Sequence, residues 1–426
     1  MKTTIMVIFT AAVAALNAVP LRGDEVVDRV RVLAAKAAPD VIAWRRDFHA
    51  HPELSNQEEQ TAAKVAEALR ALGVDELRTG VAHHGVVALI RGGQPGPTVA
   101  LRADMDALPI QEQTGLPFAS KNPGVMHACG HDAHTAILLG AAKVLMEMRD
   151  ALPGTVKLIF QPAEEGAPPG EEGGARLMIR QGVLEEPSVA AIFGLHVGTE
   201  LESGKIACRP GPLLASVDRF RVTFEGRQSH AAMPWQGCDP IIAAAHAITA
   251  IQTIASRKVD ARKPVVVSVG ILKAGQAWNI IPQTVTMEGT IRSHDPDVRR
   301  QAGDEFRRII EQTASAHGAV ARIEFSDYGP VVFNNEELTE KMRPALVLTA
   351  GEENVVEAEP VMGGEDFAHY AQEVPGMYFF LGVRNESIGA VHSVHTPYLV
   401  IDEAALPLGV QAMALLAIEY LRREAN

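Results

Sequence analysis

The stretch MHACGHDAH, from Met126 to His134, concentrates side chains that can bind a metal: three imidazoles, one thiol and one carboxylate. Apolar residues at the helical period of about 3.6 follow at once, from Ile137 to Met148, so the polar cluster lies in the loop that leads into a helix. Cysteine and histidine together favour transition metals. The stretch therefore predicts part of a metal site rather than a polar turn.

A pair of adjacent acids, Glu164 and Glu165, follows the apolar run Thr155–Phe160 in the sequence QPAEEG. Taken alone, the pair could be two solvated surface acids. The preceding run predicts a buried strand, however, and such a strand would lead the pair into the crevice of a sheet. Adjacent carboxylates can divide the work of a hydrolase, because one binds metal while the other moves protons.

Two histidines follow other apolar strands. His196 comes directly after Val189–Leu195, and His395 lies in the loop VHSVHTPYL after Met377–Leu381, with His392 as an alternative. Either one alone could be a capping or core histidine. With the residues above they supply five candidate ligands, about the number that two divalent ions need when they share bridging groups and keep positions open for water and substrate. These ligands are Cys129, His131, Glu165, His196 and His395.

Apolar strands and amphipathic helices alternate along most of the chain, which predicts an α/β fold with a mostly parallel sheet. Polar candidates, including Asp104 and Asp106, fall repeatedly just past the strand ends. Ligands of open α/β sheets bind outside the carboxyl ends of the strands, so we expect these side chains at one edge. The predicted strands are Gly85–Arg91, Pro97–Asp104, Thr155–Phe160, Val189–Leu195 and Met377–Leu381, and the predicted helices include Glu25–Phe48, Gln57–Leu72 with Asn56 as its N-cap, Gly174–Arg180, Glu336–Thr349, Asp366–Gln372 and Glu403–Arg422.

From about residue 214 to residue 326 the pattern becomes β-α-β-β-α-β, which is typical of a ferredoxin-like α+β domain. The α/β pattern resumes afterwards, so we expect an insert at 214–326 within a metal-binding domain formed by 24–213 and 327–426. The insert carries His230, Asn279 and Arg292. A histidine there could close over a substrate and polarise its carbonyl, and an Asn and an Arg could hold a carboxylate. Each could equally be an ordinary loop or strand-end residue.

Composition limits the class of protein. At 426 residues the chain is long enough for two domains, and 47% hydrophobic with 21% charged residues is typical of a soluble globular protein. The net charge of −13 argues against a nucleic-acid partner, since phosphate binding depends on clustered Lys and Arg. A small-molecule substrate is the expected partner.

The N-terminus has the layout of a secretory signal peptide: Lys2 precedes the apolar run Ile5–Leu16, and charged residues begin at Arg22. We therefore expect residues 1–23 to be a leader and linker that direct the protein to the periplasm or outside the cell. A retained N-terminal helix on a cytoplasmic protein is the alternative. No other stretch approaches a membrane span. Cys208 and Cys238 could pair in an exported protein or remain free thiols.

A series of motifs runs in order from Arg102 to Pro397: RADMDALPI, HACGHDAH, QPAEEG, GLHV, SHAAMP, NIIPQ, GTIRS, GGEDFA and HTP. With them the sequence closely resembles the M20 metallopeptidases, specifically the amidohydrolase branch that includes hippurate hydrolases, N-acyl-amino-acid amidohydrolases and plant auxin-conjugate hydrolases. The resemblance implies a di-metal catalytic domain and an inserted lid domain that often mediates formation of a homodimer. It implies two divalent metal ions per subunit, zinc or manganese first, with cobalt or nickel as alternatives.

Carried over position by position, the family pattern makes the same five residues the metal ligands. It makes Glu164 the general base that activates a metal-bound water, and His230 a lid histidine that stabilises the oxyanion and can reach the neighbouring subunit's site. Asp106 matches an acid that orients a ligand. Asn279 and Arg292 match lid positions near the substrate carboxylate.

The expected function is a metal-dependent amidohydrolase that cleaves the amide bond of N-acyl amino acids or similar small conjugates, and a dipeptidase or carboxypeptidase with the same machinery is the alternative. A non-catalytic relative is disfavoured because no ligand or acid is missing. A cysteine hydrolase that uses Cys129 would keep its activity in the presence of a chelator. Gln228 and Ser229 replace two glycines of the family pattern and Trp235 replaces a histidine, which leaves the substrate preference open.

Overall fold

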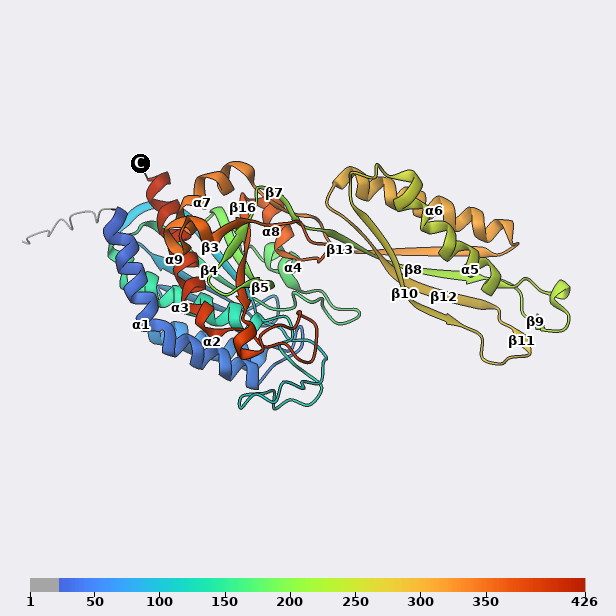
Figure 1. Ribbon diagram of the computed structural model, residues 1–426, viewed down its shortest axis with the longest axis horizontal. Coiled ribbons are helices and arrows are strands. Elements are labelled where there is room, and N and C mark those ends of the chain that lie inside the picture. Colours follow the sequence, from blue (N-terminus) through green and yellow to red (C-terminus); the bar gives the residue numbers. More distant parts are fainter. Residues whose placement is uncertain (1–22, 426) are drawn as a thin grey trace, which may run out of the picture.

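The chain builds two parts that lie end to end along its long axis (Figure 1). The computed structural model describes residues 23–425, so the predicted leader, apart from Gly23, lies outside the described residues. The larger part contains both ends of the described chain. The smaller part is formed by the middle of the chain, from Ser216 to Gly329.

The larger part is organised around an eight-stranded sheet. Its strands, in spatial order, are β1 (Glu76–Val81), β2 (Gly85–Arg91), β4 (Pro153–Gln161), β3 (Gln94–Asp104), β5 (Val189–Glu202), β16 (Gly376–Arg384), β6 (Ile206–Cys208) and β15 (Val355–Glu357). The four central strands β4, β3, β5 and β16 are parallel, so their carboxyl ends meet at one edge. The prediction of a parallel sheet is confirmed for this centre, whereas the pairs β1–β2, β2–β4 and β6–β16 are antiparallel.

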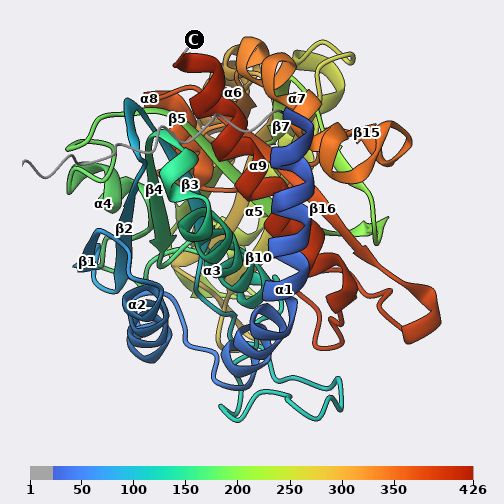
Figure 2. The same ribbon diagram turned by 90° about the vertical axis from the view of Figure 1, so that its left-hand side faces the viewer.

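Helices cover both faces of this sheet. Five helices pack on one face, with α1 and α9 crossing in front of the sheet in Figure 2: α1 (Gly23–Ala50), α2 (Glu59–Leu72), α3 (His131–Glu147), α7 (Glu336–Ala350) and α9 (Leu406–Glu424). On the other face lie α4 (Gly174–Arg180) and α8 (Phe367–Glu373). Side chains along β2 alternate between these faces: Val86 and Ala88 pack on the face covered by the five helices, and Val87 packs on the face covered by α4 and α8. Burial of both faces explains why the central strands are apolar throughout.

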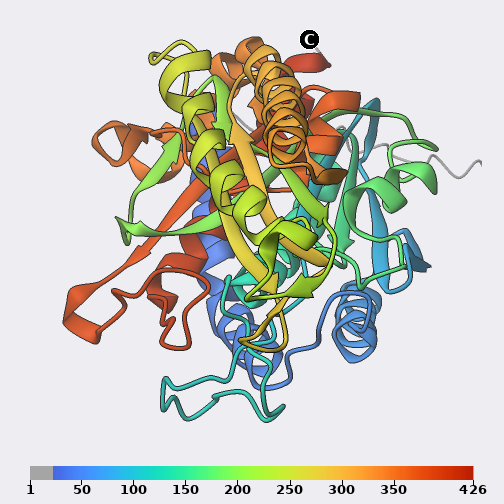
Figure 3. The ribbon, with the colours of Figure 1, turned by 90° about the vertical axis from the view of Figure 1, so that its right-hand side faces the viewer.

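The smaller part, which we call the lid, is a four-stranded antiparallel sheet with two helices on one face (Figures 1 and 3). Its elements are β8 (Ser216–Glu225), α5 (Pro240–Ile251), β10 (Val265–Ala274), β12 (Thr284–Ser293), α6 (Pro296–Ala316) and β13 (Val320–Gly329). The spatial order β10-β12-β8-β13 confirms the predicted ferredoxin-like arrangement. Phe220, Val222 and Phe224 alternate along β8 because only one face of the sheet meets the helices, where they pack against Phe306.

Two short strands, β9 (Ser229–His230) and β11 (Ile280–Ile281), pair at the end of the lid that points away from the larger part (Figure 1). We call this end, residues 229–236 and 275–281, the tip. The opposite end, which adjoins the larger part around Arg292 and Tyr328, is the near end.

Two local predictions are wrong. Asn56 is not the N-cap of α2, because it adopts a left-handed backbone with φ of 62° and its amide donates to Glu171 across a loop. Strand β5 does not end before His196 but continues to Glu202, because it keeps pairing with β16, where Phe380 lies opposite His196. His196 therefore lies inside a strand.

Among residues 23–425, the segment Glu403–Glu424, which includes α9, is long and apolar enough to cross a membrane by length and composition. However, 72% of its apolar stretch is buried inside the protein, as in a core helix. The cysteines Cys129, Cys208 and Cys238 are all free thiols.

Candidate metal centre

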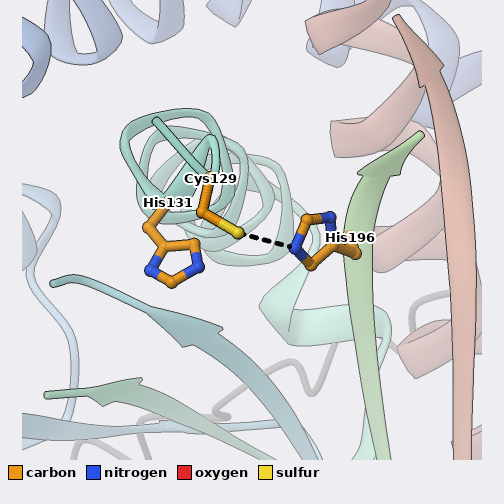
Figure 4. A group of neighbouring side chains, drawn as sticks. All are labelled: Cys129, His131 and His196. Atoms are coloured by element: carbon orange, nitrogen blue, oxygen red, sulfur yellow. Dashed lines mark hydrogen bonds between the residues drawn. The ribbon is translucent and has the colours of Figure 1, made fainter. Parts of the chain in front are cut away.

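The loop before α3 positions the first two candidate ligands. Gly130, between Cys129 and His131, has a φ of 92°, in the region that glycine adopts without strain. A Cβ atom at this position would lie 2.5 Å from Cγ2 of Val197 in β5. The glycine thus lets the loop approach β5 closely, and this brings Cys129 and His131 next to His196 (Figure 4).

These three side chains form a first group. Their ligand atoms lie within 4.8 Å of one another, and Sγ of Cys129 is 3.3 Å from Nε2 of His196. Nδ1 of His196 donates to the main-chain oxygen of Val197 at 2.8 Å, so Nε2 carries the free lone pair that a metal requires. Burial, followed by the nearby His134, lowers the pKa of His196 to about 3 and keeps the imidazole neutral.

The other two candidates form a second group around the same thiol. Nε2 of His395 lies 3.3 Å from Sγ of Cys129 and 3.2 Å from Oε1 of Glu165. A third group joins Glu165 to His131 and Glu164. The groups share members, so all five predicted ligands meet in one place. His395 is exposed, which leaves this side of the cluster open to solvent.

The donor set suits divalent transition metals. A soft thiol, three borderline imidazoles and one hard carboxylate form a mixed set of the kind that zinc and similar divalent ions bind. Nε2 of His131 is buried and has no hydrogen-bond partner within the described part of the chain, although its Nδ1 is held by Asp106. A buried polar atom without a partner destabilises a fold unless something binds it. The residues therefore fit a metal site.

Asp106 connects two of the candidate ligands. Its Oδ1 lies 3.2 Å from Nδ1 of His131, and its Oδ2 accepts from Oγ of Ser55 at 2.7 Å and from the main-chain N–H of Glu165 at 3.0 Å. Burial alone would raise the pKa of Asp106, but the hydrogen bond and charge of His131 outweigh it and lower the pKa. The carboxylate thus orients the imidazole and the loop that carries Glu165.

Two other polar residues of MHACGHDAH have structural partners. His134 uses both ring nitrogens: Nδ1 contacts Asp104 at 2.6 Å, and Nε2 accepts from the main-chain N–H of Val197 at 2.9 Å. Asp132 pairs with Arg45 and His49, each at 2.8 Å. These contacts fix the start of α3 to β3, β5 and α1.

Glu164 is buried at the edge of the ligand cluster. Its Oε2 lies 4.0 Å from Nε2 of His131, and its Oε1 accepts from the main-chain N–H of Asp366 at 3.3 Å. Burial, followed by the nearby Glu365 and Glu165, raises the pKa of Glu164 well above its ordinary value. A carboxyl group held in place at this position can exchange protons with a molecule bound to the ligand cluster.

The motifs did not indicate the charged network behind Glu164. The buried guanidinium of Arg102 forms ion pairs with Asp104 at 2.7 Å, Glu365 at 2.9 Å and Asp366 at 2.8 Å. Through Asp366 the network reaches Glu164. One signal was available: an arginine inside the apolar strand VALRAD must be paired if the strand is buried.

The predicted lid residues lie at the two opposite ends of the lid. His230 and Asn279 are exposed at the tip, where the N–H of Ala231 donates to the carbonyl of Asn279 at 3.0 Å. Arg292 lies at the near end, where its Nη1 donates to the main-chain oxygen of Met362 at 2.7 Å. Strand β12 separates the two ends by roughly 30 Å at about 3.3 Å per residue. Within one chain, the structure brings neither His230 nor Asn279 to the metal cluster.

The sequence and the fold both match known hydrolases. The model of peptidase family M20/M25/M40 matches residues 100–419. The chain is 44% identical to thermostable carboxypeptidase 2 of Saccharolobus solfataricus over 89% of this chain and 95% of that protein. It is 42% identical to N-acetyl-L-cysteine deacetylase of Bacillus subtilis over 86% of this chain and 84% of that protein. The solved structure of the Bacillus subtilis YXEP protein, described as a dinuclear metal binding peptidase from the M20 family, is 39% identical, with a TM-score of 0.77 over 91% of this chain and 99% of that one.

Proposed function

The chain belongs to peptidase family M20/M25/M40 and is a metal-dependent hydrolase, and we propose that it cleaves the amide bond of N-acyl amino acids. The observation that carries this proposal is the cluster of five ligand side chains with Glu164 at its edge. The substrate class follows from chemistry that two relatives share by name. An N-acetyl amino acid and the end of a peptide cut by a carboxypeptidase both present an amide bond one carbon away from a free carboxylate.

We propose that the cluster binds two divalent ions. Cys129, His131 and His196 would hold one, and Cys129, Glu165 and His395 the other, with the thiol shared between them. The related YXEP protein is described as dinuclear, which supports this number. Zinc or manganese suits the mixed sulfur, nitrogen and oxygen donors best, and cobalt or nickel is the alternative. Such ions polarise a bound carbonyl and lower the pKa of a water.

Glu164 serves in this proposal as the general base. Two divalent ions bound beside Glu164 would lower its raised pKa and favour the ionised form. The carboxylate then takes a proton from the attacking water and delivers that proton to the leaving amide nitrogen. The main-chain N–H of Asp366 holds one carboxylate oxygen, and Asp106 holds the loop through the N–H of Glu165. Correct orientation of the carboxylate is therefore a property of the surrounding network rather than of Glu164 alone.

The position of the tip supports a homodimer in which His230 of one subunit serves the site of the other. His230 lies too far from its own cluster to contact a substrate there, whereas the tip exposes large apolar side chains. Trp278 is 94% exposed and Trp235 is 75% exposed. Strand β10 is an unpaired edge of the lid sheet with Ile271 and Leu272 exposed. In the partner's site the imidazole of His230 would stabilise the oxyanion. Asn279 at the same tip would bind the substrate carboxylate there, and Arg292, which lies closer to the ligand cluster of its own chain, is the alternative.

A hydrolysis screen tests the proposed substrate class. The purified protein, supplied with Zn²⁺ or Mn²⁺, is assayed on N-acetyl, N-benzoyl and longer N-acyl amino acids and on dipeptides and longer peptides of matched C-terminal residue. We expect higher kcat/KM for the N-acyl amino acids, and loss of activity with a chelator that added metal restores. Faster cleavage of peptides would establish the carboxypeptidase or dipeptidase alternative. Activity that survives the chelator would instead indicate a cysteine hydrolase based on Cys129.

We also propose that the protein is exported, on the basis of the N-terminal sequence pattern alone. N-terminal sequencing of the mature protein from cells tests this: a new terminus near Ala15 or Ala18 is expected, and a chain that still begins at Met1 would contradict it.

A further inference from the structure

Tyr328 connects the lid directly to the proposed general base. It lies on β13, the last strand of the lid, close to where the chain returns to the larger part. Its hydroxyl donates to the main-chain oxygen of Glu164 at 2.5 Å and lies 3.5 Å from Oε1 of the same residue. Neither the motifs nor the residue spacing of the sequence indicated this contact.

The ring of Tyr328 lies in a slot between two glycines. A Cβ atom on Gly364 would lie 3.5 Å from one edge of the ring, and a Cβ atom on Gly166 would lie 3.6 Å from another. At Gly364 the same Cβ would be 2.5 Å from Cγ2 of Val217, so a larger residue would push the segments apart. The slot is thus formed by the loop that carries Glu164 and by the GGED segment, residues 363–366, and it fixes where the hydroxyl points.

Other contacts at the near end fix residues 361–363, which lead into the GGED segment. Nη1 of Arg292 donates to the carbonyl of Met362 at 2.7 Å, and Nε2 of His294 contacts the carbonyl of Val361 at 2.8 Å. The N–H of Ala215 donates to the carbonyl of Gly363 at 2.9 Å. The segment then supplies the Asp366 N–H that holds Oε1 of Glu164. Glu164 is therefore held from two directions, both of which depend on the near end of the lid.

We propose that Tyr328 is a positioning residue that holds Glu164 in the orientation needed for proton transfer. The hydroxyl has a single proton, which it gives to the main-chain oxygen of Glu164, and this fixes the peptide from which the carboxylate projects. The other carboxylate oxygen, Oε2, lies 4.0 Å from Nε2 of His131 and faces the ligand cluster. The inference rests on the proposed function, because it assigns Tyr328 a part in that reaction.

Tyr328→Phe tests the proposal, because it removes only the hydroxyl and leaves the ring in its slot. Tyr420→Phe is the matched control: Tyr420 is at the C-terminal end of α9, where its ring packs against Phe193. For both variants and the wild type, kcat and KM are measured on the best N-acyl amino acid at equal metal content. Hydrogen exchange of the peptide 161–167 is followed by mass spectrometry. That peptide contains the amides of Ala163 and Glu165, which are hydrogen-bonded to Glu58 and Asp106.

For Tyr328→Phe we expect kcat to fall about tenfold with KM within about twofold, and exchange of 161–167 to become faster, while Tyr420→Phe matches the wild type. Unchanged exchange, unchanged kcat, or a loss that lies in KM or in bound metal would each overturn the proposal. A wild-type protein that hydrolyses no N-acyl amino acid would refute the proposed function. The exchange measurement needs no substrate and would still decide whether the hydroxyl holds the loop.

Discussion

At the near end of the lid, Arg292, His294 and Tyr328 are hydrogen-bonded to the larger part, and Tyr328 reaches Glu164. At the tip, His230 and Trp278 are exposed. The same small domain thus has one end that contacts the loop carrying Glu164 in its own chain, and another end that carries a candidate catalytic side chain far from that loop. In the proposed homodimer the lid would therefore serve two sites: its own through the near end, and a partner's through the tip.

The contrast also separates two kinds of contribution to catalysis. Groups at the near end touch the protein's own loops, so their loss should change how Glu164 is held. Groups at the tip would touch the substrate in another subunit, so their effect should depend on a second copy of the chain. Mutations at the two ends therefore predict different dependences on dimerisation.

The largest expected effect comes from His230 at the tip. His230→Ala removes an oxyanion donor and should lower kcat by about 10²–10³-fold, while the metal content stays the same.

Glu164→Ala should also retain metal and lose turnover, because the proton acceptor is gone. Each variant alone should be nearly inactive, and steady-state kinetics with metal analysis would show it.

Mixing the two variants tests where His230 acts. After subunit exchange, a dimer with one chain of each kind has one site that combines an intact Glu164 with an intact His230 from the other chain. With random pairing, the 1:1 mixture should recover about a quarter of the wild-type activity. A quarter is the most that random pairing allows, because half of the dimers are mixed and each of these has one active site of two. No recovery of activity would mean that His230 acts within its own chain. That outcome would remove the division between the two ends.

Trp278 at the tip should have a smaller effect, on assembly rather than on folding. Trp278→Ala deletes a side chain that is 94% exposed in the single chain, so the free energy of unfolding of one subunit should stay nearly constant. If the tip lies in a dimer interface, burial of the indole should contribute about 2 kcal/mol or more, and the dimer dissociation constant should rise at least tenfold. Sedimentation equilibrium over a range of protein concentrations measures this dissociation constant. Phe333→Ala, which removes an exposed ring from the larger part, is the control and should leave the constant unchanged.

The sequence was sufficient to predict that the five candidate ligand side chains lie together, because their positions obey a local rule. Cys129 and His131 lie at the start of a helix, Glu165 follows a strand, and four parallel strands end at one edge. Apolar runs identify the strands, and the strand ends then identify the site. The same rule misplaced the end of β5, because pairing with β16 extends that strand past His196.

Contacts between distant segments could not be predicted in this way. Tyr328 meets Glu164 across 164 positions, and Arg102 meets Asp366 across 264. Spacing along a strand gives the distance between Asn279 and Arg292 but not which end of the lid adjoins the larger part. Such contacts depend on how two parts pack, and a single sequence carries no direct record of that packing.

The smallest expected effect is at the near end, and it completes the comparison with Trp278. His294→Ala removes one hydrogen bond to the carbonyl of Val361, which should lower the free energy of unfolding by about 0.5–1.5 kcal/mol and Tm by about 1–3 °C. The dimer dissociation constant should not change, because the contact lies within one chain, and the thermal shift and sedimentation measurements together show both results. The two substitutions therefore predict opposite patterns: a less stable chain with normal assembly for His294→Ala, and a stable chain with weaker assembly for Trp278→Ala. If His294→Ala weakened the dimer as much as Trp278→Ala, the near end would also lie in the interface, and the lid could not be divided into an end that serves its own site and an end that serves a partner's.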